Sequence, residues 1–118
     1  MADFGLFIGF GAPARSRELQ ASKVFGEAMA YFGGLQQSGE IEGVQVAVLE
    51  VHGGELGGFM LLRGDRERLA NLRASAEFER ILLRADFSVD HVGVVSALLD
   101  GEAARFVGQA NSMTADLA

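Results

Sequence analysis

The order of strand-like and helical segments constrains the fold of this chain more than any other feature. Residues 3–10 alternate large apolar side chains with mostly small or polar ones in a period of two, which predicts a strand. Residues 15–37 follow helical spacing, and residues 43–51 and 58–63 predict two strands joined by a glycine-rich loop. A second helical stretch at 66–85 and a strand at 89–98 complete the order β-α-β-β-α-β. This is a split βαβ arrangement, whose strands have the spatial order 4-1-3-2 and whose helices cover one face of an antiparallel sheet.

Capping residues predict where the helices begin and end. Gly39 can end the first helix, Asp65 can cap the second, and Ser75 predicts a break near Ala74.

The segment after Asp100-Gly101 has two interpretations. Asp-Gly can form a tight hairpin into a fifth strand, or a short helix can follow, for which the apolar positions are Ala103, Phe106, Val107 and Ala110. A chain of 118 residues is expected to form one domain, here 1–109, with 110–118 as a C-terminal tail.

The chain resembles the dimeric α/β-barrel superfamily of ferredoxin-like proteins. The resemblance covers residues 3–109 and is carried by "FGLFIGFG", "GVQVAVLEV…GGFMLLRG", "ERLANLRASAEFERILLRA" and "HVGVVSALL". It implies an α+β protomer with an antiparallel sheet and a barrel built by two copies. Members include antibiotic-biosynthesis-type monooxygenases, haem-degrading proteins, muconolactone-isomerase-like proteins and many of no known activity. The resemblance therefore implies a fold and a homodimer more than a reaction.

The bare sheet face also predicts a homodimer through sheet faces. Four strands about 4.8 Å apart and roughly 20 Å long present a footprint on the order of 400 Å². An apolar patch of that size needs a partner. If Val51 pairs with Gly58, the face toward the partner carries Val46, Val48, Glu50, Phe59, Leu61 and Arg63. Ala47, Leu49, Val51, Met60 and Leu62 would then lie under the helices.

Composition excludes several classes of function. The chain has 10 basic and 16 acidic side chains, a net charge of −6, which argues against nucleic acid as a partner. The absence of cysteine removes disulfides, thiolate metal sites and cysteine nucleophiles. No apolar run reaches the length of a membrane span, and the N-terminus lacks the basic start of a signal peptide. We therefore expect a soluble, cytoplasmic protein without a membrane partner.

The motif "IGFGAPAR" at 8–15 matches the glycine pattern of a dinucleotide-binding turn, but its context does not. Such a turn requires an acidic residue about 20 residues later, at the end of the second strand. Here that strand ends near Glu50, close to twice as far away, and continues into a hairpin. The motif is interpreted as a strand-to-helix corner.

The few polar groups near the predicted sheet face toward the partner are the candidate site residues. His91 is the candidate for proton transfer, since histidine titrates near neutrality, although a satisfied polar group at the dimer interface is the favoured alternative. Arg63 would hold an anionic or enolate oxygen. Glu50, His52, Phe59 and Phe7 are the candidate ligand contacts, although aromatic side chains are more typical of a core.

The two histidines and Glu50 have the composition of a two-histidine, one-carboxylate metal site. The expected strand order places His52 and His91 on opposite sheet edges, about 14 Å apart, so no metal site is predicted. No residue specifies a cofactor. Haem binding is implied only by the resemblance to this superfamily.

Two functions remain open. In the first, an enzyme or binder holds a small apolar molecule inside the barrel. In the second, a non-catalytic dimer has a packed interior. A cavity of a few hundred Å³ would distinguish them, because packed side chains leave no such space.

Overall fold

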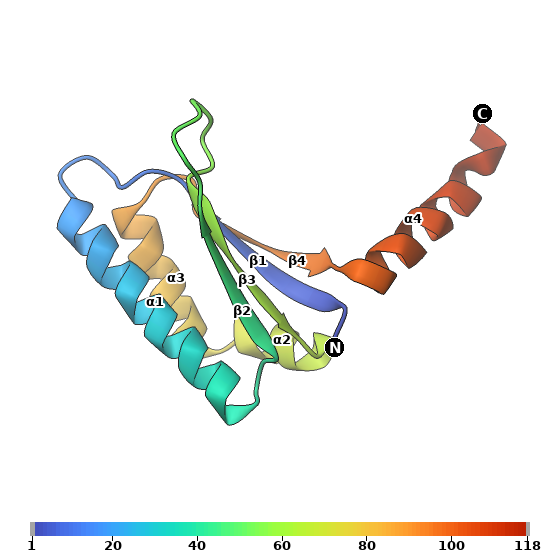
Figure 1. Cartoon of the computed structure of the whole chain (residues 1–118), viewed down its shortest axis with the longest axis horizontal. Helices are drawn as coiled ribbons and strands as arrows, with labels where there is room; N and C mark the ends of the chain where they lie inside the picture. The colour runs from blue at the N-terminus through green and yellow to red at the C-terminus, as the bar shows by residue number, and fades with distance from the viewer. Residues whose placement is uncertain (1, 118) are drawn as a thin grey trace.

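The strands form one antiparallel sheet with the predicted spatial order (Figure 1). The computed structural model describes residues 2–117. Within them the sheet order is β2-β3-β1-β4, which confirms the prediction. The elements in chain order are β1 (Phe4–Phe10), α1 (Glu18–Ser38), β2 (Gly43–Val48), β3 (Gly58–Gly64), α2 (Arg66–Arg73), α3 (Ala76–Ser88), β4 (Gly93–Leu98), α4 (Asp100–Thr114) and the short helix η1 (Ala115–Leu117).

The predicted caps are confirmed. Gly39 ends α1 in the left-handed region, with φ of 85°. The side chain of Asp65 accepts a hydrogen bond from the Arg68 amide at the start of α2. Ser75 accepts one from the Phe78 amide, and this cap separates α2 from α3.

Several segment ends differ from the prediction. Strand β2 ends at Val48 rather than Val51, and α1 begins at Glu18 rather than Arg15. Strand β4 begins at Gly93 rather than Val89, because His91 has a positive φ of 57° and interrupts the extended backbone. The segment after Leu99 is the helix α4 rather than a fifth strand, and α4 continues past Ala110, where a tail was expected to begin.

The register of the β2–β3 hairpin corrects part of the predicted face assignment. Val48, not Val51, pairs with Gly58. A shift of an odd number of residues moves every side chain to the other face. Val46 and Val48 therefore lie on the helix side and Ala47 on the bare side, the reverse of the prediction.

The assignment for β3 is correct. Met60 and Leu62 are buried under the helices, and Phe59, Leu61 and Arg63 lie on the bare side. We call this bare side the open face; it comprises Gly5, Phe7, Gly9, Gly43, Gln45, Ala47, Phe59, Leu61, Arg63, Gly93, Val95 and Ala97.

The core lies between the helix side of the sheet and the helices. Leu6 of β1 and Leu62 of β3 are almost fully buried. Across from them, the rings of Phe32 on α1 and Phe78 on α3 lie with centroids 6.0 Å apart. The buried positions of α1 are Ala21, Val24, Ala28 and Phe32, whereas Leu19 near its start is 85% exposed.

Replacement of Leu62 by Ala tests this core assignment. Leu62 has no exposed surface, so Leu62→Ala removes apolar contacts and leaves a cavity. We expect a loss of about 3 kcal/mol in the free energy of unfolding, measured by urea denaturation. Leu83→Ala, at a side chain 61% exposed on α3, is the matched control and should change it by less than about 0.5 kcal/mol. Equal losses for both variants would contradict the assignment.

Candidate functional site

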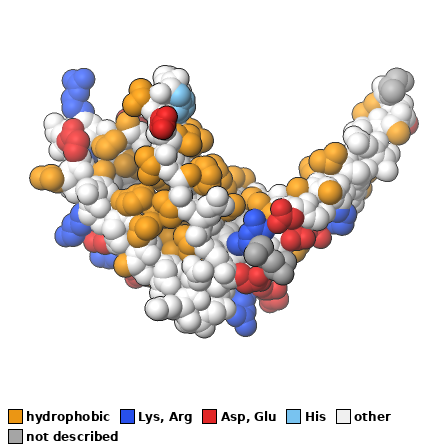
Figure 2. Space-filling view, viewed as in Figure 1, with side chains coloured by type: hydrophobic (Ala, Val, Ile, Leu, Met, Phe, Trp, Pro, Cys, Tyr) orange, Lys and Arg blue, Asp and Glu red, His pale blue; other side chains and the backbone are white. Residues whose placement is uncertain are grey.

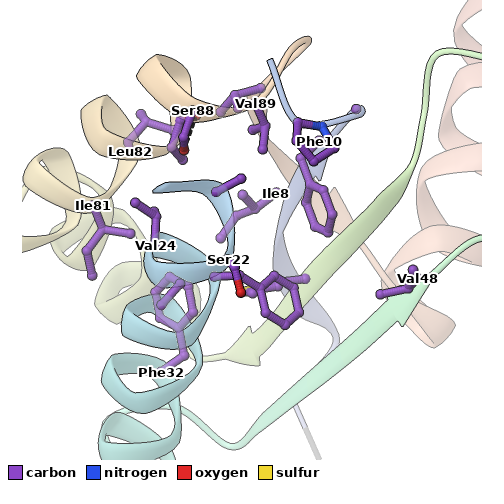
Figure 3. Close-up of a pocket in the computed structure, with 18 of the residues that line it drawn as sticks. Ile8, Phe10, Ser22, Val24, Phe32, Val48, Ile81, Leu82, Ser88 and Val89 are labelled. Carbon is purple, nitrogen blue, oxygen red and sulfur yellow. Dashed lines mark hydrogen bonds between the residues drawn. The ribbon is translucent and has the colours of Figure 1, made fainter. Parts of the chain in front are cut away.

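A pocket of about 340 Å³ lies between α1, α3 and the helix side of the sheet (Figure 3). Val24, Phe32 and Ile81 project into it from the helices, and Ile8 and Phe10 line it from β1. Met60, Phe78 and other buried core residues form its inner wall, so the pocket extends into the hydrophobic core. The remaining lining residues are Gly11, Pro13, Glu18, Ala21, Ser22, Phe25, Ala28, Val48, Leu82, Ala85, Ser88, Val89 and Val92.

Small side chains at facing positions account for the pocket. On α1, Ala21 near the N-terminal end and Ala28 at the middle occupy the buried stripe, and the large Phe32 follows toward the C-terminal end. On α3, Ala85 and Ser88 face the same space. The axis of α1 also diverges from the strands toward its N-terminus (Figure 1), so short side chains do not fill the gap there.

This pocket was not predicted from the sequence. The signal that could have found it is the seven-residue spacing of Ala21 and Ala28 on an otherwise large apolar stripe.

The lining is almost entirely apolar. Among the described residues, Glu18 is the one lining side chain that carries a charge, and it lies on the exposed first turn of α1 beside Ser22. The buried Ser88 hydroxyl donates within its own helix, to the carbonyl oxygen of Arg84 at 2.9 Å. Polar groups therefore stand at the mouth, and the interior offers dispersion contacts and exclusion of water.

Three of the predicted site residues lie near the loop end of the sheet, outside this pocket. His91 precedes β4, and its Nδ1 lies 3.8 Å from the Glu55 carboxylate. His52, in the loop between β2 and β3, accepts a hydrogen bond from the Gly54 amide at Nδ1, and its Nε2 lies 2.8 Å from the Leu56 carbonyl oxygen. Glu50 is exposed in the same loop.

The other three lie on the open face. The rings of Phe7 and Phe59 stack with centroids 5.1 Å apart. Arg63 donates to Asp100 at 2.9 Å, at the end of the sheet away from the histidines. The structure thus separates Arg63 from His91, and the roles given to all six residues remain predictions.

The described residues limit two further kinds of site. Within 2–117, no group of three or more acidic or histidine side chains is arranged to hold a metal ion. Over the same range, no helix has both the length and the apolar character of a membrane span.

An ion pair ties together the two helices that wall the pocket. Arg84 of α3 donates two hydrogen bonds, each 2.9 Å, to the carboxylate of Glu27 on α1. The hydrogen bond from Arg84 lowers the pKa of Glu27 below its usual value, with Coulombic attraction to Arg84, Arg80 and Lys23 adding to the effect and partial desolvation opposing it.

Solved structures match this chain in fold. No family model matches the sequence, and no curated protein matches it either. A dabb family protein with a ferredoxin-like fold from Mesorhizobium loti has a TM-score of 0.62 at 9% identity, covering 83% of this chain and 98% of its own. A dimeric ferredoxin-like protein of unknown function from Thermobifida fusca has a TM-score of 0.60 at 9% identity, covering 84% and 93%.

A third structure, a dimeric ferredoxin-like protein of unknown function from Jannaschia sp., has a TM-score of 0.58 at 15% identity and covers 82% of this chain and 98% of its own. At these identities the likeness establishes the fold. The chain has the ferredoxin-like α+β fold expected from its sequence.

The Glu27–Arg84 pair predicts a pH dependence of stability. Because the folded pKa of Glu27 is lowered, the pair stabilises the protein above the unfolded pKa, and this stabilisation is lost as pH falls through the folded pKa. Glu27→Gln should therefore melt slightly below wild type near neutral pH, and the difference should vanish in strong acid. Thermal melts over that range measure it, with the exposed Glu40→Gln as control. A difference that persists undiminished in acid would contradict the assignment.

Proposed function

We propose that this chain is a homodimeric binding protein for a small apolar molecule held in the pocket between α1, α3 and the sheet. The observation that carries the proposal is an apolar space of about 340 Å³ that opens from the core. Small-molecule sites have volumes of about 300–1,000 Å³ and are mostly apolar with few polar groups. The pocket fits this description at the small end.

The lining selects the class of ligand. A polar group placed deep in the pocket would lose its water without gaining a hydrogen bond, at a cost of about 1–3 kcal/mol. An aliphatic or aromatic molecule with its single polar end at Glu18 and Ser22 avoids that cost. We infer that hydrocarbon-rich ligands with one polar end are bound in this orientation.

Binding is favoured over chemistry by the placement of the titratable groups. A general acid or base must lie within hydrogen-bond reach of the reacting atom. The walls offer Glu18 at the mouth and Ser88, whose hydroxyl donates to a backbone carbonyl. The alternative, catalysis by His91 and Arg63 on the partner side of the sheet, would require two groups that lie toward opposite ends of the sheet.

The homodimer is supported by the open face. Phe7 pairs with Leu61 of β3 and with Val95 of β4, and its ring lies against the ring of Phe59, so these four side chains form a continuous apolar surface. Val95 is 57% exposed. The neighbours of the same fold from Thermobifida fusca and Jannaschia are described as dimeric. A second copy of this face is the simplest cover, since a two-fold interface uses one patch twice.

Filling the pocket tests the binding proposal. Titration with N-phenyl-1-naphthylamine, a neutral apolar dye that fluoresces when shielded from water, should saturate on wild type. Ala85→Phe places a ring into the pocket and should weaken binding at least about tenfold. Ala30→Phe, at an exposed position of α1, is the matched control and should bind like wild type. Saturable binding that is unchanged in Ala85→Phe, or absent from wild type, would overturn the proposal.

Charge on the open face tests the dimer. Leu61→Asp places a carboxylate at the centre of the proposed interface and should convert the dimer to a folded monomer, measured by sedimentation velocity with circular dichroism. Leu83→Asp, on the exposed side of α3, carries the same charge and should remain dimeric. If Leu61→Asp sediments as a dimer, the interface lies elsewhere.

A further inference from the structure

Helix α4 contacts little of its own chain. None of its residues is buried, and it leaves the end of β4 as an arm directed away from the body (Figure 1). The radius of gyration is 16.1 Å, whereas a compact domain of this length has about 13.5 Å. The arm accounts for this extended shape, which has a longest dimension of 52 Å.

The arm is amphipathic: the polar side chains of one side have partners within the helix, whereas the apolar side chains of the other side are exposed. On the polar side, Arg105 pairs with Glu102 at 2.8 Å and with Gln109 at 3.3 Å. The other side carries an apolar stripe at helical spacing, which we call the arm stripe: Ala103, Phe106, Val107, Ala110, Met113 and Leu117. Phe106 is 53% exposed, Val107 58% and Met113 68%.

A short amphipathic helix of this kind needs an apolar surface to pack against in order to be stable. A 15-residue helix is marginal in water without tertiary contacts. The arm stripe exposes large apolar side chains along its whole length, so its stability depends on packing outside its own fold. The arm therefore presents an apolar side that its own chain does not cover.

The arm begins on the open face. Arg63, an open-face residue, donates to Asp100 at the first residue of α4, and the Leu99 amide donates to the Asp3 carbonyl oxygen at 2.8 Å. The side chains of Leu99 and Leu61 meet over Gly5, where an added Cβ would lie 3.0 and 3.1 Å from them. The apolar surface of the sheet thus continues through Leu99 toward the arm.

A hollow separates the arm from the body, and hydrophobic side chains line the arm on the side facing it (Figure 2). The proposed dimer interface and the arm stripe therefore border the same space. A body seated on the open face would touch both.

We propose that the arm stripe packs against a second copy of this chain seated on the open face, so that each copy clasps the other. This inference rests on the proposed homodimer. The size of the interface supports it, because stable interfaces bury about 800 Å² per partner, whereas the sheet footprint is on the order of 400 Å². A helix of 15 residues is about 22 Å long and roughly 10 Å wide, and it supplies much of the missing area.

The charge of the arm favours a protein over a lipid surface. Helices that lie on membranes carry Lys and Arg on their polar side to meet anionic lipids. Here α4 and η1 carry Asp100, Glu102 and Asp116 against the single Arg105. The uncharged stripe instead matches the uncharged central part of the open face.

Two variants with the same added charge test the clasp. Phe106→Glu places a carboxylate on the arm stripe and should raise the dimer dissociation constant at least about tenfold, measured by sedimentation over a concentration series. Gln109→Glu adds the same charge on the polar side of the same helix and should leave the constant unchanged. Equal constants for both variants and wild type would overturn the clasp while leaving the dimer intact.

A tryptophan probe reads the arm directly, because the chain has no tryptophan of its own. In Phe106→Trp the emission should be blue-shifted in the dimer and should move to the red when Leu61→Asp makes the protein monomeric. Gln109→Trp should emit as a water-exposed indole in both states. Red emission of Phe106→Trp in the dimer would overturn the clasp.

Two further outcomes count against the proposal and separate it from the dimer. Blue-shifted emission of Phe106→Trp in the Leu61→Asp monomer would show that the arm packs on its own chain. A blue shift that requires anionic vesicles would show a membrane surface instead. If wild type is monomeric at all concentrations, the proposed dimer itself fails, and the clasp fails with it.

Discussion

The structure depends on one constraint: the helices α1 and α3 cover the same face of a four-stranded sheet (Figure 1). Leu6, Met60 and Leu62 turn toward the helices and make the core, while Phe7, Phe59 and Leu61 turn the other way. Because side chains alternate along a strand, a chain that builds the first surface also builds the second. The proposed pocket lies on the covered face and the proposed dimer on the bare face, so the two functions are separated by the thickness of one sheet.

The covered face of the sheet is tightly packed at one end of α1 and forms the apolar pocket at the other. Phe32 and Phe78 fill the space at one end of α1, whereas Ala21, Ala28 and Ala85 leave it open at the other. An unfilled apolar space costs stability in proportion to its volume, because its lining lacks contacts. A ligand that binds the folded chain returns that stability through linkage. The ion pair between Glu27 and Arg84 holds the two wall helices together beside the gap.

The sequence predicted the helix caps and the strand order correctly, but it failed on the register of the β2–β3 hairpin and on which candidate residues lie together. The caps at Gly39, Asp65 and Ser75 follow from backbone chemistry within a few residues. The face of β2 was wrong because the hairpin register depends on how the loop at 49–57 folds, with the Leu49 amide donating to the Gly57 carbonyl oxygen. The candidate site residues were chosen by their chemistry. His91 precedes β4 and Arg63 lies near the end of β3, at opposite ends of the sheet, so the fold keeps them apart.

The sequence alone determined the order of elements, the α+β class, the spatial order of the strands and the existence of a bare sheet face. Each follows from periodicity, capping or topology, which act over short distances or through general rules of chain connection. Only the tertiary structure decided the pocket, since it arises where α1 diverges from the sheet and small side chains from two helices face each other. The position of α4 away from the body also comes from the tertiary structure. An amphipathic pattern indicates that a helix packs against a surface, but it does not indicate whether that surface belongs to the same chain.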